Sequence, residues 1–233
     1  MATLLAPPID ALLLDFGHTL CDTASSVEFI TTWTSARGLV LSASDAQLLW
    51  DDARVRSRSG EEVAKGRDRT PALHRACWTA LWAPLDARAP GVADALYDYE
   101  TGPLGWTPYV DTLPFLRAVR ERGVRVAVVS DVAFELEPIA EAHGFADLVD
   151  TFVLSYRHGA LKADGPALFE VALAALDVPA PRSLMVGDNN VNDGVGISAG
   201  LRTLLLPHAP SGGPRGLATV LAMIDGLRRV QTS

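Results

Sequence analysis

Short apolar runs alternate with amphipathic stretches over residues 11–20 and 105–233. Continuous runs such as Leu12-Leu13-Leu14 are typical of strands that are buried on both faces of a parallel sheet. Strands are predicted at residues 11–15, 124–130, 151–155, 184–186 and 203–206. Helices are predicted at residues 110–122, 134–143, 166–176, 192–199 and 215–230. The alternation predicts an α/β fold, with a parallel sheet core flanked by helices.

Residues 21–104 have a different pattern, with no β-branched runs and repeated helical spacing. The predicted helices lie at residues 27–37, 44–58, 71–82 and 91–100. We expect four tryptophans of this segment to pack its own core: Trp33, Trp50, Trp78 and Trp82. The chain is therefore predicted to have a core at residues 1–20 and 105–233. An all-helical domain at 21–104 is inserted after the first strand, and a cleft between two such domains is a frequent ligand site.

Composition narrows the possible partners. The formal net charge of −8 argues against a nucleic-acid or anionic-membrane surface, since both select basic patches. Cys21 and Cys77 are too few for a disulfide framework. Residues 1–14 lack the basic start of a signal peptide, and no apolar run approaches the length of a membrane span. We expect a cytoplasmic protein that binds neither nucleic acid nor membrane, and both a monomer and a homodimer stay open.

Polar residues follow four predicted strands at the edge where open α/β sheets bind ligands. They are Asp15 with Thr19 close behind, Ser130, Lys162, and Gly187-Asp188-Asn189-Asn190-Val191-Asn192-Asp193. Asp15 can act as a nucleophile or a metal ligand, and Asp188 and Asp193 add the oxygen ligands that suit Mg²⁺. A Ser hydroxyl and a Lys ammonium can hold the other oxygens of a phosphoryl group. The set predicts phosphoryl transfer through an aspartyl-phosphate.

The order and spacing of these motifs resemble the haloacid dehalogenase-like hydrolase superfamily, which has a Rossmann-like core and, in many members, a helical cap after the first strand. The shared patterns are an apolar run with Asp-x-x-x-Thr at 15–19, a run ending in Ser130, Lys162, and Gly-Asp-x-x-x-x-Asp at 187–193. The resemblance implies that Asp15 is the nucleophile and an Mg²⁺ ligand. It also implies that the Gly17 carbonyl and Asp188 bind the ion, and that Asp193 binds it or orients its waters.

The same resemblance assigns the substrate side of the site. Ser130 is expected to bind phosphate, and Lys162 to offset charge on the nucleophile and the phosphoryl group. Thr19 occupies the position of the motif's hydroxyl and is placed with the substrate-binding residues. The cap carries several arginines, but one helix cannot aim positions 54, 56 and 58 at the same cleft. We expect one of Arg58, Arg67 and Arg69 to contact the substrate.

The sequence departs from the family pattern beside the nucleophile. Phosphatases of the family usually carry a second Asp two residues after the first, as general acid/base, and here that position is Gly17. A positioned general acid/base contributes roughly 10²–10⁴-fold to the rate. The next position, commonly Gly, is His18, whose imidazole could replace the Asp as proton donor but lies one backbone position away. We expect His18 to fill the loop beneath the cap, beside the substrate. Lys162 is followed by Ala163 in place of the usual Pro.

Gly17 leaves three interpretations open. The favoured one is an Mg²⁺-dependent phosphatase of a small phosphorylated metabolite, slow or substrate-assisted. The second is a weak or inactive relative that binds a phosphorylated ligand or partner. The third is a haloacid dehalogenase or a phosphonate-cleaving relative. Family dehalogenases need no metal, which leaves Asp188 and Asp193 unexplained, and the phosphonate branch uses a cap lysine. The lysine of the predicted cap, Lys65, lies in a charged loop that suits a solvated side chain.

Overall fold

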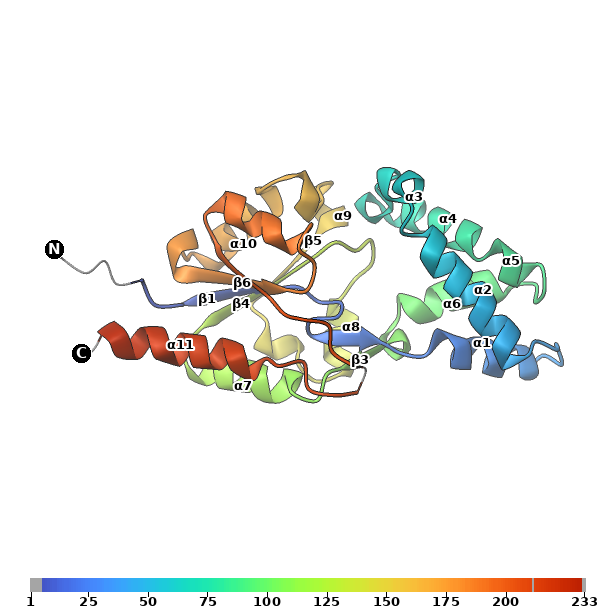
Figure 1. The fold of residues 1–233 in the computed structure, drawn as a ribbon, viewed down its shortest axis with the longest axis horizontal. Helices are drawn as coiled ribbons and strands as arrows, with labels where there is room; N and C mark the ends of the chain where they lie inside the picture. Colours follow the sequence, from blue (N-terminus) through green and yellow to red (C-terminus); the bar gives the residue numbers. More distant parts are fainter. Residues whose placement is uncertain (1–5, 211, 232–233) are drawn as a thin grey trace.

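The computed structural model shows an α/β core and a helical insert joined side by side (Figure 1). It describes residues 6–210 and 212–231, so residues 1–5, 211 and 232–233 of the predicted core lie outside the described residues. The described chain begins and ends at the side of the core that is remote from the insert (Figure 1). No described helix combines the length and apolar character that crossing a bilayer requires.

The core is built on a five-stranded parallel sheet with β1 at its centre. The strands run in the order β5 (Thr151–Leu154), β4 (Arg125–Ser130), β1 (Ala11–Leu14), β6 (Ser183–Gly187) and β7 (Arg202–Leu205). The five predicted strands are confirmed, and no strand end differs from its prediction by more than one residue. The chain leaves β1 toward β4 on one side and later returns to β6 on the other. The carboxyl ends of these strands therefore form the crevice where open α/β sheets bind ligands.

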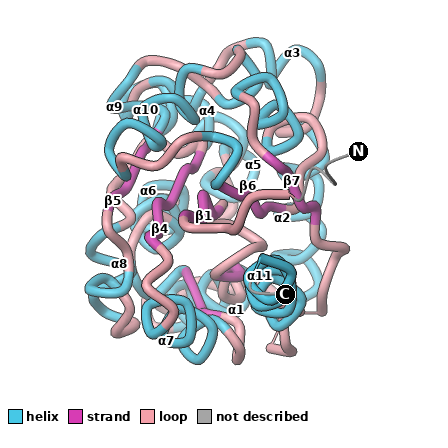
Figure 2. The backbone as a smooth tube through the Cα atoms, turned by 90° about the vertical axis from the view of Figure 1, so that its left-hand side faces the viewer, coloured by secondary structure: helices cyan, strands magenta, loops and turns pink. Residues whose placement is uncertain are grey.

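Strand residues alternate between two helical layers, because successive side chains of a strand point to opposite faces. Leu12 and Leu14 belong to a buried cluster with α7 (Thr112–Glu121), α8 (Glu137–Ala142) and α11 (Ala218–Gln231). Ala11 and Leu13 pack on the other face against α10 (Ala167–Leu176). Figure 2 shows α10 above the sheet and α7 and α11 below it. All four β1 side chains are fully buried, which explains the unbroken apolar run in the sequence.

The insert consists of short helices around a second apolar cluster. The helices are α1 (Ser26–Ser35), α2 (Ala43–Arg56), α3 (Gly60–Ala64), α4 (Pro71–Leu81), α5 (Ala83–Asp86) and α6 (Val92–Glu100), with the 3₁₀ turn η1 (Arg67–Arg69) between α3 and α4. The expectation for the tryptophans is confirmed, because Trp78 and Trp82 are buried in this cluster and Trp33 and Trp50 pack against it. Ser42 caps α2 by accepting a hydrogen bond from the Asp45 backbone N–H.

A two-stranded antiparallel ribbon joins the insert to the core. Its strands are β2 (Cys21–Thr23) and β3 (Trp106–Pro108). They are too short for an alternating pattern to reveal them in the sequence. The remaining short elements are α9 (Ser155–His158), η2 (Pro103–Gly105), η3 (Ala146–Leu148), η4 (Lys162–Asp164) and η5 (Ala180–Arg182).

The turn η1 ties the far side of the insert to the core. The Ser155 hydroxyl donates to the Asp68 carbonyl at 2.7 Å. The Arg69 guanidinium donates to the Gly159 carbonyl at 3.0 Å and to the Asp164 carboxylate at 2.7 Å. The insert thus meets the core both at the ribbon and at η1.

The helix predicted at residues 192–199 is a 3₁₀ helix, η6 (Asp193–Ala199), and the prediction of its type is wrong. Two glycines lower the α-helical propensity of this segment. One of them, Gly196, lies so close to β6 that an added Cβ would be 3.3 Å from the Met185 Cβ. The Asp193 carboxylate accepts hydrogen bonds from the backbone N–H groups of Asp188 at 3.0 Å and Asn189 at 2.9 Å. These contacts fold the chain back tightly after β6.

The close approach of Asp193 to the end of β6 leaves no room for a side chain at residue 187. A Cβ added at Gly187 would lie 2.0 Å from the Asp193 carboxylate. We predict that Gly187→Ala destabilises the protein by about 2 kcal/mol, as overpacking does, which lowers Tm by roughly 4–8 °C in a chain of this size. Thermal unfolding followed by circular dichroism measures this. Gly194→Ala is the matched control, since nothing lies within 4 Å of its added Cβ. Equal Tm values for the two variants would contradict the prediction.

Candidate active site

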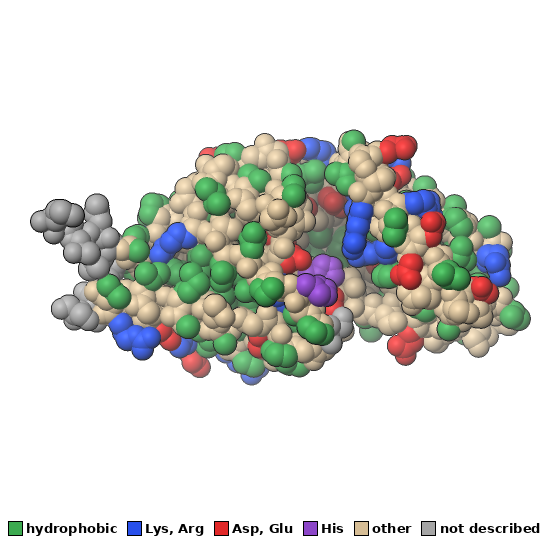
Figure 3. Space-filling view, in the orientation of Figure 1, with side chains coloured by type: hydrophobic (Ala, Val, Ile, Leu, Met, Phe, Trp, Pro, Cys, Tyr) green, Lys and Arg blue, Asp and Glu red, His purple; other side chains and the backbone are tan. Residues whose placement is uncertain are grey.

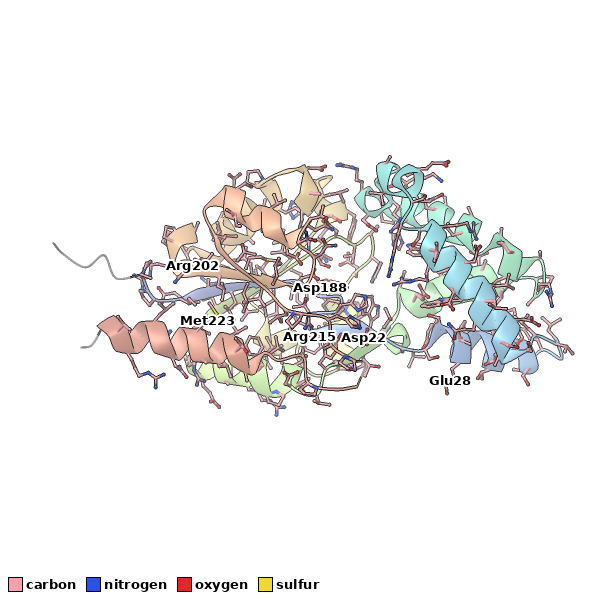
Figure 4. The ribbon with its side chains drawn as sticks, viewed as in Figure 1. Asp22, Glu28, Asp188, Arg202, Arg215 and Met223 are labelled. Carbon is pink, nitrogen blue, oxygen red and sulfur yellow. The ribbon has the colours of Figure 1, made fainter. Side chains whose placement is uncertain are left out.

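A cleft of about 340 Å³ separates the carboxyl ends of the strands from the insert. Its core side includes Asp15, Gly17, His18, Ser130, Lys162 and Asp188. Its insert side includes Arg54, Arg67, Asp68, His74, Trp78 and Glu100. Figure 3 shows the recess between the two bodies, with basic side chains on the border that the insert provides. The labelled Asp188 and Asp22 lie at the edge of the core that faces the insert (Figure 4).

The centre of the site is a buried ion-pair chain. The Lys162 ammonium lies 2.7 Å from Asp15 Oδ1 and 2.5 Å from Asp193 Oδ1, and its side chain is 3% exposed. Burial raises the pKa of Asp15 to about 7. The charge of Lys162 acts to lower this pKa, and the neighbouring carboxylates of Asp193 and Asp188 act to raise it. Burial alone would lower the pKa of Lys162, but Asp15, Asp193 and Asp131 raise it, so the ammonium stays charged. One cation thus serves several carboxylates.

Three of these carboxylates can hold a metal ion together. One oxygen each of Asp15, Asp188 and Asp193 lies within 4.8 Å of the others. Oxygen ligands of this kind suit Mg²⁺, and a divalent cation would offset the charge that Lys162 leaves unbalanced. Within the described ranges, no backbone or side-chain donor bonds to the Gly17 carbonyl, so this oxygen is available as a further ligand. The residues present therefore fit the ion.

Asp193 is more tightly held than the other two candidate ligands. Its Oδ1 accepts from Lys162, and its Oδ2 accepts from the backbone N–H groups of Asp188 and Asn189. The Asp193 carboxylate is fully buried, whereas the Asp188 carboxylate is exposed. The contacts of Asp193 hold Lys162 and the Asp188 turn in place beside Asp15.

Ser130 lies at the end of β4, next to the end of β1, and lines the cleft although the residue is only 4% exposed. Its hydroxyl has no hydrogen-bond partner in the described part of the chain, so it is free to bind a ligand oxygen. Thr19, by contrast, is not brought to the cleft. The chain turns back after β1 through hydrogen bonds from Leu20 and Cys21 to the Phe16 carbonyl, and this turn buries Thr19 completely.

Gly17 and His18 form the loop that follows Asp15. A Cβ added at Gly17 would lie 3.6 Å from the Trp106 ring, which is ordinary contact, so the fold tolerates a side chain there. His18 lines the cleft with a left-handed backbone, at φ 55°, and its Nδ1 is 3.1 Å from Asp22 Oδ1. The buried guanidinium of Arg215 donates to the His18 carbonyl at 2.5 Å and so holds this turn. No sequence pattern indicated this role of Arg215, which lies 197 residues from His18.

The insert brings charged and aromatic side chains to the cleft. The sequence analysis identified only some of them. Arg67 and Arg54 line the cleft. The contact of one of the three arginines with the substrate stays a prediction. Arg69 instead binds the core, and Arg58 is exposed. Lys65 is not among the cleft residues and pairs with Glu62 at 2.5 Å.

Asp68 was not identified from the sequence, where it reads as one more charge in a polar loop. Only the docking of η1 onto the core reveals that it faces the cleft. His74 lies beside it, within the insert, with Nδ1 2.8 Å from the Tyr97 hydroxyl. Burial, followed by the charge of Arg67, lowers the pKa of His74 to about 4. His74 is therefore neutral at physiological pH.

Comparisons with known proteins agree with this architecture. The profile of the haloacid dehalogenase-like hydrolases matches residues 9–200. The mouse haloacid dehalogenase-like hydrolase domain-containing protein 3 is 32% identical over 116 residues, which are 49% of this chain and 46% of the mouse protein. The chain thus matches about half the length of this curated relative.

Solved structures of two activities share the fold. A dehalogenase with an intermediate complex superposes with a TM-score of 0.70 at 18% identity, covering 94% of this chain and 99% of the other. The phosphatase of this superfamily from Thermococcus onnurineus gives a TM-score of 0.61 at 17% identity, with the same coverage. At such identities the likeness establishes the fold alone. Because the family profile extends over most of the sequence, the chain belongs to the haloacid dehalogenase-like hydrolases.

Proposed function

We propose that this hydrolase is an Mg²⁺-dependent phosphatase that acts on a small phosphorylated molecule, with Asp15 as the nucleophile. The observation that carries the proposal is the grouping of the Asp15, Asp188 and Asp193 carboxylates within 4.8 Å of one another, with Lys162 paired to Asp15 and Asp193. A divalent cation balances this charge, and a phosphoryl group is the reacting unit that such an ion and a neighbouring hydroxyl bind best. A metal-independent dehalogenase has no use for the exposed carboxylate of Asp188.

The contacts of Asp15 suit nucleophilic attack. Lys162 binds Oδ1 and favours the ionised carboxylate, while no described residue donates to Oδ2. We propose that Oδ2 forms a bond to phosphorus as the bond to the leaving-group oxygen breaks. Water then attacks the aspartyl-phosphate, which frees inorganic phosphate and restores the Asp15 carboxylate. Ser130 and Lys162 hold phosphoryl oxygens during both steps.

The role proposed for bound Mg²⁺ is to neutralise charge on the phosphoryl oxygens. Asp15, Asp188 and the Gly17 carbonyl would hold the ion. Asp193 is proposed to contribute mainly by fixing Lys162 and the turn that carries Asp188, because its own oxygens already accept three hydrogen bonds.

The nucleophile is tested by Asp15→Asn. We predict that this variant loses phosphate release by more than about 10³-fold, since the amide cannot form the covalent intermediate. A panel of phosphomonoesters with Mg²⁺ and a phosphate-release assay measures it. Release that survives Asp15→Asn would contradict the assignment. Halide release from a 2-haloacid without Mg²⁺ would identify a dehalogenase instead. A wild type silent on every ester, with a Gly17→Asp variant that gains hydrolysis, would identify a binding protein.

The metal site is tested by Asp188→Asn. We predict that this change weakens Mg²⁺ binding by roughly 10-fold or more, since a charged oxygen ligand becomes neutral. Isothermal titration calorimetry with MgCl₂ alone measures the affinity without any substrate. Asp177→Asn, an exposed position with a left-handed backbone that Asn tolerates, is the matched control. Equal affinity of the two variants would remove Asp188 from the metal site.

A further inference from the structure

The proposed phosphatase reaction lacks one component on the core side, because Gly17 has no side chain to move a proton. The leaving alkoxide needs a proton, and the attacking water must lose one. We propose that Asp68, from the helical insert, is the general acid/base of this active site. This inference rests on the proposed function and adds a residue that the core motifs do not contain.

The position of Asp68 is fixed by the core itself. Its carbonyl accepts the Ser155 hydroxyl at 2.7 Å, and Ser155 Oγ also accepts the backbone N–H of Val132 at 3.0 Å. Val132 lies two residues after Ser130, the proposed phosphate ligand. The neighbouring Arg69 adds two hydrogen bonds to the core, at Gly159 and Asp164. Asp68 is therefore held at the same cleft as Asp15, on the opposite wall.

The carboxyl group of Asp68 is nearly free of hydrogen-bond donors. On the insert, His74 Nε2 lies 3.4 Å from Asp68 Oδ1. That nitrogen already accepts the indole N–H of Trp78 at 3.1 Å, so it carries no proton of its own. His74 is neutral for this reason and for its low pKa, and it does not hold Asp68 in the ionised state.

Burial of the Asp68 carboxyl group brings its pKa closer to neutral pH. Burial raises the pKa of Asp68 to about 6, with Arg67 acting against the shift and Asp131 adding to it. Other titratable neighbours of Asp68 are His74 and Cys77 on α4 and Tyr97 on α6; His74 is neutral, and the charge of Asp68 raises the pKa of both Cys77 and Tyr97. A group with a pKa near the working pH both donates and accepts protons efficiently.

The other carboxylates of the cleft have tasks that occupy them. Asp131 accepts the Lys162 backbone N–H at 2.9 Å and lies close to the Lys162 charge. Glu100 accepts from the Ser26 hydroxyl at 2.7 Å and from the Trp50 indole at 3.3 Å. Asp188 is assigned to the metal site. Within the described ranges, Asp68 is the carboxyl group of the cleft left for proton transfer.

The two half-reactions balance with one proton on Asp68. In the first, protonated Asp68 gives its proton to the leaving-group oxygen while the Asp15–phosphorus bond forms and the ester bond breaks. In the second, the Asp68 carboxylate takes a proton from water as the water oxygen bonds to phosphorus and the Asp15–phosphorus bond breaks. The net reaction is ester plus water to alcohol plus inorganic phosphate.

The test compares alkyl and nitrophenyl phosphates in Asp68→Asn, an isosteric change that keeps the backbone contact to Ser155. We expect turnover of alkyl phosphates to fall by roughly 10²–10⁴-fold. Nitrophenyl phosphate has a leaving group that needs no proton. With this substrate we expect a burst of nitrophenol equivalent to the enzyme, followed by slow turnover, because water attack lacks its base. The limb of the pH profile of kcat/KM that reports the titration of Asp68 should be absent from this variant.

Two further variants separate proton transfer from structure. Gly17→Asp places a carboxyl group where the fold has room for its Cβ, and we expect it to restore a large part of the activity of Asp68→Asn. Asp51→Asn, at an exposed acid on α2 of the insert, is the matched control and should behave as the wild type.

The outcomes distinguish this inference from the proposed function. An Asp68→Asn enzyme within about threefold of the wild type on alkyl phosphates would overturn the inference and leave Asp15 as nucleophile. A loss that is equal for both substrates, with no burst and no rescue by Gly17→Asp, would assign Asp68 a structural role and also overturn it. A wild type that hydrolyses no phosphomonoester would remove the proposed function, and the inference with it.

Discussion

The structure depends on one buried ammonium, that of Lys162. It lies within 2.7 Å of Asp15 and 2.5 Å of Asp193, in a place from which water is almost excluded. Burying an ionised carboxylate costs free energy unless a cation lies beside it, so the Lys162 ammonium stabilises both acids in the core. Because Lys162 lies in η4, Asp15 directly after β1 and Asp193 in η6, the same contact also fixes the relative positions of the loops that surround the site. The charge that Lys162 leaves unbalanced is what makes the site fit a metal ion.

The α/β core and the helical insert contribute different residues to the cleft around this contact. The core supplies the residues proposed as nucleophile, as metal ligands and as the phosphate-binding hydroxyl, all at the ends of buried strands. The insert closes the cleft from the other side and is tied to the core by the ribbon and by η1. Gly17 has no side chain that could transfer a proton, and the proposed role of Asp68, on the insert side of the cleft, supplies a carboxyl group for this step. The left-handed turn at His18, held by Arg215, leaves the Gly17 carbonyl directed to no described donor.

The sequence was sufficient for the core and for most of the proposed site. The five strands are strongly apolar. Because the carboxyl ends of parallel strands lie at the same edge of the sheet, Asp15, Ser130 and the Asp188 turn come together there. What the sequence did not reveal depends on long-range contacts. Thr19 is buried because the chain folds back on Phe16, and Asp68 faces the cleft because η1 docks on Ser155, 87 residues away. The 3₁₀ form of η6 follows from the contact of Asp193 with the chain just before it, which periodicity does not encode.

The central claim is that Asp15 becomes phosphorylated during turnover. It is tested most directly by mixing the enzyme with Mg²⁺ and a phosphate ester, quenching with acid within one turnover, and examining the peptide that contains residues 11–20 by mass spectrometry. The account predicts that this peptide gains the mass of one phosphoryl group, on Asp15, and that hydroxylamine removes it. An unmodified Asp15 during steady release of phosphate, or a phosphoryl group found on another residue, would contradict the account.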